Sequence, residues 1–191
     1  MSKYSLPLLI VAATTILYGC FTITFQQTEL KAENENSINN FLRNEQIDTT
    51  YSFIVDSSVY RKAFKGGFSL PRFKVYDNSG KQIFFKVGYT SSFIEKLEEA
   101  LREPEIVFEA NTLEEELKII RRYDGSSVTI SDFKKDAQYT FVEYWAIWCG
   151  PCKDQLRAID KYMKEHPNVK INHIKLNWDK QESWVLKGNE K

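Results

Sequence analysis

The sequence is poor in cysteine and carries no excess of either charge. Only three cysteines occur among 191 residues, too few for the disulfide framework of a small secreted domain. Lys and Arg together number 26, as do Asp and Glu, so the formal net charge is zero and there is no basic surplus to hold nucleic acid. With 42% hydrophobic and 27% charged residues, the composition is that of a globular chain, long enough for one domain or one domain with an added module.

A long hydrophobic run is also absent. The main apolar stretch extends from Leu6 to Leu17, which is shorter than the roughly 20 residues that a transmembrane helix needs. Lys3 precedes this stretch and small or turn-forming residues follow it, which is the pattern of an export signal. We therefore predict that residues 1–19 are a signal peptide. An uncleaved amino-terminal anchor is the alternative.

The predicted signal ends in Leu-Tyr-Gly-Cys at positions 17–20, a run that resembles the lipobox of bacterial lipoproteins. The resemblance implies that the signal is removed before Cys20 and that this cysteine carries acyl chains, palmitate among them, which hold the protein on a membrane surface. It further implies a protein of the bacterial cell envelope that faces the periplasm or the extracellular side. Residues 20–48 are polar and are predicted to form a lipidated tether, with a short helix near residues 37–44.

Two cysteines separated by two residues follow a predicted strand. Residues 140–146 form a β-branched and aromatic run of strand length, and residues 154–163 have apolar side chains at helical spacing. Cys149 and Cys152 lie between them, so one sulfur falls in the first turn of the helix. Unpaired backbone N–H groups and the positive end of the helix dipole stabilise a thiolate there. We expect Cys149 to be the exposed nucleophile and Cys152 to lie close enough to form a disulfide with it.

The run WCGPCK at positions 148–153 resembles the active site of thioredoxin. Under this resemblance Glu143, six residues before the first cysteine, occupies the position of a buried aspartate that moves protons for the second cysteine. Lys175 falls on the lysine that neighbours that carboxylate. The resemblance therefore implies a Glu143–Lys175 pair beneath the disulfide.

The second half of a thioredoxin fold does not follow the cysteines, but a segment that precedes them resembles it. Residues 70–76 and 82–87 are predicted to be two strands joined by a turn that contains glycine, and residues 93–101 have the apolar spacing of a helix. Within this segment Pro71 falls on the family's cis-proline and Gly80 on its hairpin glycine. Their order and spacing together carry the resemblance.

The predicted fold is therefore α/β, with a thioredoxin-like central mixed sheet flanked by helices, in which the carboxy-terminal half precedes the half that bears the cysteines. Residues 49–104 form the first of these segments, and residues 105–191 form the second, with the CGPC site. Either the halves pair within one chain as a permuted fold, or each half completes a partner in another molecule, or the chain is a truncated tandem. A connector helix with Leu113, Leu117 and Ile120 on its apolar face is predicted between the halves.

Two other uses of the cysteine pair stay open. With His166 and His173, Cys149 and Cys152 offer a Cys2His2 metal site, but the six residues between the histidines exceed the usual spacing. The other use is a structural disulfide without turnover, although so small a ring is strained and reducible. We interpret both histidines as surface or strand-edge residues. We expect no metal and no organic cofactor, because the electrons would be held on sulfur.

The thioredoxin resemblance implies an oxidoreductase that reduces protein disulfides through the cysteine pair. Trp148, Gly150 and Pro151 are then implied to form the surface on which substrate docks, while Pro71 presents backbone groups to the substrate chain. The implied partners are disulfide-bearing protein substrates and a membrane oxidoreductase that supplies electrons. Two rivals stay open: an oxidase or isomerase with the same site, and a lipid-anchored binding module whose cysteines are idle.

Overall fold

The structure is a computed structural model of the chain, and it describes residues 31–107 and 110–186. The predicted signal peptide, the lipidation candidate Cys20 and the first part of the predicted tether lie outside these residues. Within the part of the chain that is described, no helix is long and apolar enough to cross a membrane.

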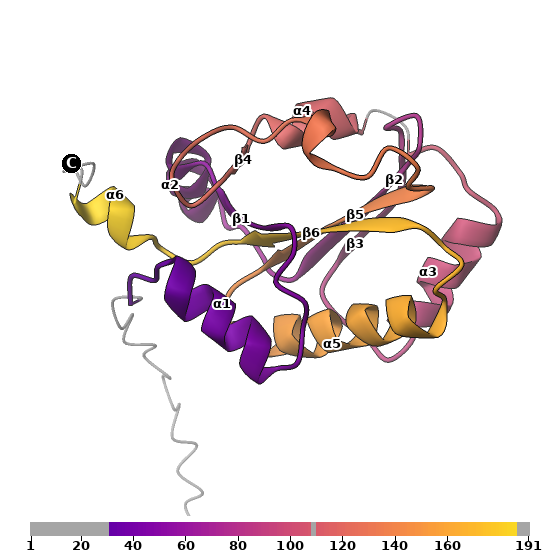
Figure 1. Cartoon of the computed structure of the whole chain (residues 1–191), viewed down its shortest axis with the longest axis horizontal. Coiled ribbons are helices and arrows are strands. Elements are labelled where there is room, and N and C mark those ends of the chain that lie inside the picture. Colours follow the sequence, from indigo (N-terminus) through magenta and orange to yellow (C-terminus); the bar gives the residue numbers. More distant parts are fainter. Residues whose placement is uncertain (1–30, 108–109, 187–191) are drawn as a thin grey trace, which may run out of the picture.

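A six-stranded mixed sheet forms the centre of the fold (Figure 1). Its strands are β1 (Ser52–Val55), β2 (Arg72–Asp77), β3 (Gln82–Val87), β4 (Ile120–Arg121), β5 (Tyr139–Trp145) and β6 (Ile171–Asn177). They lie in the order β3-β2-β5-β6-β1-β4. Strands β5, β6 and β1 are parallel, whereas β2, β3 and β4 are antiparallel to the strands that they pair with. This arrangement confirms the predicted α/β class with a thioredoxin-like mixed sheet.

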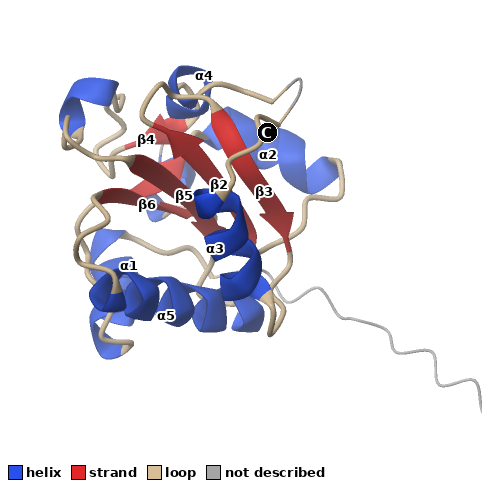
Figure 2. Ribbon diagram, turned by 90° about the vertical axis from the view of Figure 1, so that its right-hand side faces the viewer, coloured by secondary structure: helices blue, strands red, loops and turns tan. Residues whose placement is uncertain are grey.

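Helices cover both faces of the sheet. They are α1 (Glu35–Asn44), α2 (Ser57–Lys65), α3 (Phe93–Arg102), α4 (Leu113–Leu117), α5 (Gly150–Glu165) and α6 (Glu182–Leu186), with a 3-10 turn at Ile130–Asp132. Helices α1, α3 and α5 lie on one face, and α2 and α4 lie on the other (Figures 1 and 2). Because both faces are covered, the central strands β5 and β6 are buried almost throughout and show no alternation of polar and apolar residues.

Three clusters of buried side chains fill the space between sheet and helices. One lies on the α2 and α4 face, and a second packs α3 and the second half of α5 onto the sheet. The third, which we call the disulfide cluster, consists of Ile38, Leu42, Ile47, Ile54, Trp145, Ala146, Cys149, Cys152 and Leu156. It joins α1 and the first half of α5 to the sheet.

Both predicted halves contribute strands to this one sheet. Strand β2, from the upstream half, pairs along its whole length with β5, which leads to the cysteines, and Arg72 lies opposite Tyr144. Strand β1, also from the upstream half, pairs with β6, which borders β5 on the side opposite to β2. The halves therefore combine within a single chain in this structure. The interpretation of this order as a permuted thioredoxin fold stays a prediction, as do the segment boundaries at residues 49–104 and 105–191.

The predicted connector helix is shorter than expected. Helix α4 ends at Leu117, and Ile120 belongs instead to β4, where it pairs with Val55 of β1. The apolar positions Leu113, Leu117 and Ile120 are nevertheless all buried in the cluster on the α4 face. The apolar pattern therefore identified the buried side chains but not the end of the helix, because pairing with β1 takes over the last position.

Candidate active site

The cysteine pair lies where β5 gives way to α5. Cys149 is the residue that caps the amino terminus of α5, and the backbone N–H of Cys152 donates to its Sγ at 3.3 Å. Pro151, in the first turn, has no N–H to leave unpaired and suits a helix start. The two cysteines form a disulfide with their Cα atoms 5.3 Å apart. Because the first-turn N–H groups and the helix dipole favour negative charge, a thiolate on Cys149 is stabilised after reduction.

Exposure differs sharply along this loop. Cys149 is only 6% exposed and Cys152 is fully buried, so the expectation of an exposed nucleophile holds only in the sense that Cys149 is the more accessible of the two. Apolar neighbours in the disulfide cluster enclose both sulfurs. Trp148 is 46% exposed, and Gly150 and Pro151 are exposed as well. The residues predicted to meet a substrate therefore surround the disulfide with accessible surface.

The upstream half of the chain lies beside the disulfide. The Leu70–Pro71 peptide bond is cis, as the resemblance predicted. Because Arg72 lies opposite Tyr144, Pro71 is placed at the end of β5 that leads into the cysteine loop. The Leu70 side chain packs against the disulfide cluster. The structure thus brings the predicted Pro71 next to the predicted cysteines.

Helix α1 also contributes to the site, although its residues fall within the segment predicted to be a tether. Phe41 stacks on Trp145 with ring centroids 5.4 Å apart, directly under the cysteine loop. At the end of α1 the Glu45 carboxylate binds Lys153 Nζ at 2.5 Å and also pairs with Arg157, so it is held by two cations of α5. The part of the predicted tether that the structure describes is therefore packed against the helix that bears the cysteines.

Glu143 lies on the face of β5 that α5 covers. Its neighbours on that face of the strand, Phe141 and Trp145, pack against the second and first halves of α5 respectively. Glu143 is fully buried, and its Oε2 lies 2.9 Å from Nε2 of His173 on β6. Its other carboxyl oxygen has no hydrogen-bond partner among the residues described.

The predicted Glu143–Lys175 pair is formed only in part. The two residues lie opposite each other in the β5–β6 register, but the lysine Nζ donates to the backbone carbonyl of His173 at 3.3 Å rather than to the carboxylate. The carboxyl hydrogen bond goes to His173 instead. The interpretation of His173 as a surface or strand-edge residue is wrong: it is 5% exposed, on a central strand.

Burial moves all three groups toward their neutral forms. It raises the pKa of Glu143 well above its usual value, and the nearby Lys175 opposes this only in part. Burial, with a contribution from the lysine charge, holds the pKa of His173 well below its usual value. Burial lowers the pKa of Lys175 to about 8, against the attraction of neighbouring carboxylates that include Glu143. Burial therefore favours the uncharged forms of Glu143 and His173, and Lys175 gives up its proton more readily than a solvated lysine does.

Asp179 supports the cysteine loop and was not identified from the sequence. Its Oδ2 accepts hydrogen bonds from the backbone N–H of Ile147 and from the side chain of Asn177, both at 2.8 Å. Burial raises its pKa to about 6 in spite of these hydrogen bonds. A signal was available: β5 and β6 are parallel, so the polar residues that follow β6 meet the loop that follows β5 at the same edge of the sheet.

The proposed Cys2His2 metal set is not brought together. Cys149 and His166 flank opposite ends of α5, which places them about 25 Å apart at 1.5 Å per residue. His173 is engaged with Glu143. Among residues 31–107 and 110–186 there is no group of three or more His, Cys, Asp or Glu side chains placed to hold a metal ion.

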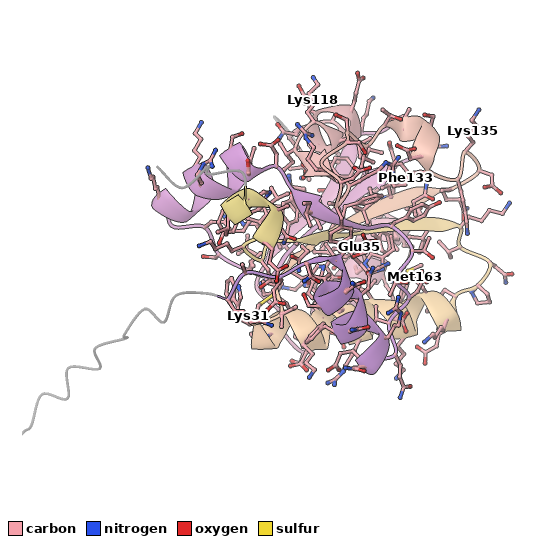
Figure 3. The ribbon with its side chains drawn as sticks, turned by 60° about the vertical axis from the view of Figure 1, so that its left-hand side comes forward. Lys31, Glu35, Lys118, Phe133, Lys135 and Met163 are labelled. Carbon is pink, nitrogen blue, oxygen red and sulfur yellow. A yellow bond between two sulfur atoms is a disulfide. The ribbon has the colours of Figure 1, made fainter. Side chains whose placement is uncertain are left out.

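A large cavity of about 1090 Å³ lies away from the cysteines, at the end of the sheet where β5 and β6 begin. Its lining includes Leu117, Lys118, Phe133 and Lys135, of which the last three are labelled in Figure 3. None of the residues predicted to form the redox site lines this cavity.

Comparison with known proteins finds similarity to one family over about the last third of the chain. Residues 127–189 match the family model described as Thioredoxin. The thioredoxin of Rickettsia felis is 39% identical over 59 residues, which cover 29% of this chain and 55% of that protein. The thioredoxin of Rickettsia prowazekii is 38% identical over 58 residues, which cover 28% of this chain and 54% of that protein. This chain thus spans about half the length of the curated relatives it matches, and no solved structure matches it.

Proposed function

We propose that this chain, a thioredoxin-like protein by the match of residues 127–189, is a thiol–disulfide oxidoreductase that reduces protein disulfides. The observation that carries the proposal is the Cys149–Cys152 disulfide at the start of α5, with cis-Pro71 of the upstream half beside it. A helix amino terminus lowers the pKa of a thiol placed there, and the thiolate is the species that attacks a disulfide.

In the first step the Cys149 thiolate attacks one sulfur of a substrate disulfide. A bond forms between Cys149 Sγ and that sulfur, the substrate S–S bond breaks, and the departing substrate thiolate takes the electron pair and then a proton from water. In this proposal the exposed Trp148, Gly150 and Pro151 offer the docking surface, and the backbone at Pro71, a buried residue at the start of β2, aligns the substrate chain.

In the second step Cys152 resolves the mixed disulfide. Its thiol gives up a proton toward Glu143, and the resulting thiolate attacks Cys149 Sγ. The Cys149–Cys152 bond forms, the bond to the substrate breaks, and the second substrate thiolate leaves with the electron pair. The protein ends oxidised, and a donor must return two electrons before the next cycle. All electrons are carried on sulfur, so the proposal includes no cofactor.

The location and the electron donor belong to the same proposal. We infer that the chain is exported and lipidated at Cys20, so that it is held on a membrane of the bacterial envelope with its body facing the periplasm or the extracellular side. The support is the sequence run at 17–20. A protein there would receive electrons from a membrane oxidoreductase and pass them to disulfide-bearing client proteins.

Substitution of the nucleophile tests the proposal. Cys149→Ser should reduce the rate of insulin disulfide reduction by the full chain to the background rate, because the thiolate that attacks the substrate disulfide is lost while Cys152 is fully buried. Cys20→Ser is the matched control: it should leave this rate unchanged in solution and move the protein from the membrane fraction to the soluble fraction. An equal rate in Cys149→Ser would favour the binding module with idle cysteines.

The reduction potential of the Cys149/Cys152 pair decides the direction of electron flow. A value near that of thioredoxin, about −270 mV, would support a reductase. A value near about −120 mV would identify a protein that oxidises its clients, and the proposed direction would be wrong.

A further inference from the structure

His173 connects the buried carboxyl group of Glu143 to a second, small cavity. The imidazole lies on β6, and its Nε2 is 2.9 Å from Glu143 Oε2. The same residue lines a cavity of about 90 Å³ on the α5 side of the sheet. Met163 of α5, labelled in Figure 3, borders this cavity as well. The cavity has exposed residues at its rim, Asp48 and Lys134, so it reaches the surface.

Six of the eight residues that line the cavity have polar or ionisable side chains, and they come from four separate parts of the chain. Besides His173 they are Asp48, Tyr51, Lys134, Asp160 and Lys175. Such a lining can hold and pass protons, whereas the disulfide cluster on the other side of Glu143 is apolar. Protons that leave the buried carboxyl group therefore have polar side chains on the side of this cavity, where His173 lies.

Glu143 needs a partner if the protons that it accepts are to reach solvent. Its carboxyl group is fully buried, and among the residues described one oxygen lies 2.9 Å from His173 Nε2 while the other has no hydrogen-bond partner. An imidazole in this position can accept a proton at one ring nitrogen and release another from the second. The hydrogen bond to Glu143 and the place of His173 in the cavity lining therefore give His173 a role.

We propose that His173 is a proton relay that acts through Glu143 and carries the proton of Cys152 to solvent through the small cavity. The inference rests on the proposed function. When Cys152 becomes a thiolate, its proton passes to Glu143, a proton passes from Glu143 to His173 Nε2, and the other ring nitrogen releases a proton to the cavity. The number of protons balances, because one proton leaves Cys152 and one proton is released to the cavity. The electron pair left on Cys152 Sγ forms the new bond to Cys149 Sγ.

The two steps of the exchange can be observed separately with an aromatic disulfide whose thiolate is coloured. One equivalent of 5,5′-dithiobis(2-nitrobenzoate) releases one thionitrobenzoate when Cys149 attacks and a second when Cys152 resolves the mixed disulfide. Stopped-flow measurements use the reduced full chain with Cys20→Ser in every variant, so that the third cysteine does not react. We expect His173→Ala to slow the second release about tenfold and to leave the first unchanged, since general acid–base groups contribute about 10²-fold or more when they act directly.

Rescue separates proton transfer from a structural role. Added imidazole should restore the second release in His173→Ala, whereas pyrazole, which has the same shape but is a far weaker base, should not. His173→Gln can keep a hydrogen bond to Glu143 but cannot carry the proton, so it should be as slow as the alanine variant. The matched control is His166→Ala, because this other histidine of the chain lies at the far end of α5 and is half exposed.

The outcomes distinguish the two proposals. If the parent chain gives no second release, the proposed function fails and the relay fails with it. If the parent chain gives both releases but neither His173 variant slows the second, or if pyrazole rescues as well as imidazole does, the relay alone is overturned.

Discussion

Two buried carboxyl groups lie on opposite faces of the sheet, and they are held in different ways. Glu116 of α4 lies on one face, where its Oε2 binds Lys74 Nζ at 2.6 Å and the Tyr76 hydroxyl at 3.0 Å. Glu143 lies on the other face and bonds to an imidazole, while its neighbouring lysine donates to a backbone carbonyl. Both carboxyl groups are almost inaccessible, at 1% and 0% exposed.

The difference lies in which partner reaches the carboxyl group. A lysine at 2.6 Å compensates the carboxylate directly, and the Lys74 side chain is 16% exposed, so part of its charge stays hydrated. Burial and then the charge of Glu116 raise the pKa of Tyr76, which keeps that hydroxyl a donor. The first site is therefore a fixed ion pair that ties α4 to β2. At the second site the carboxyl group and its imidazole partner can exchange a proton, and of these two sites the second lies beneath the helix that carries the cysteines.

Replacement of Glu143 by glutamine should have the largest effect on the exchange reaction. In Glu143→Gln we expect the second thionitrobenzoate release to slow by about 100-fold, because the group that receives the Cys152 proton is lost. The stability of the oxidised protein should change by less than about 1 kcal/mol, since glutamine has nearly the shape of the protonated acid. Stopped-flow kinetics and urea unfolding measure the two quantities.

The same substitution on the opposite face should reverse this pattern. We expect Glu116→Gln to lower the free energy of unfolding by about 2 kcal/mol, because the two hydrogen bonds lose their charge and Lys74 loses its counterion. Both thionitrobenzoate releases should stay within about twofold of the parent rates. Urea unfolding at constant m-value measures the loss. If the Glu116 variant slows the second release as much as the Glu143 variant does, the contrast between the two sites is wrong.

Local features of the site could be predicted because they depend on neighbours in sequence. The strand before the cysteines, the helix after them and the disulfide between Cys149 and Cys152 all follow from residues within one short run. The apolar spacing likewise identified Leu113, Leu117 and Ile120 as buried. Each of these conclusions needs only the periodicity of one element.

Features that depend on two elements meeting could not be predicted in this way. The Glu143–His173 hydrogen bond depends on the β5–β6 register, which joins residues 30 positions apart. Side chains two residues apart in a strand point to the same face, so His173 lies on the same face as Lys175. Once Lys175 was assigned to the buried site beneath the disulfide, a buried position for His173 could have been inferred as well.

A short helix near residues 37–44 was predicted and is present as α1, and Ile38, Phe41 and Leu42 recur in it at helical spacing. Its packing against the cysteine-bearing helix was not predicted, because most of the segment is polar enough to suit a tether.

The lysine beneath the disulfide should reveal itself in the pH dependence of stability. The pKa of Lys175 is about 8 in the folded protein, below its ordinary value of 10.5. Between these two pKa values the unfolded chain binds more protons than the folded one. The free energy of unfolding should therefore rise with pH, by about 1 kcal/mol per pH unit over most of this interval. Urea unfolding of the oxidised protein from about pH 7.5 to about pH 9.5 measures the slope before the tyrosines titrate.

Lys175→Met should flatten that slope, because the group that titrates is gone. Lys74→Met, the same change at the ion pair on the other face, should lower stability but keep the slope that Lys175 produces. A flat profile in the parent protein would mean that Lys175 keeps its ordinary pKa and stays charged in the folded state over this range. In that case Lys175 would not exchange protons near neutral pH, and the proton-exchanging site would consist of Glu143 and His173 alone.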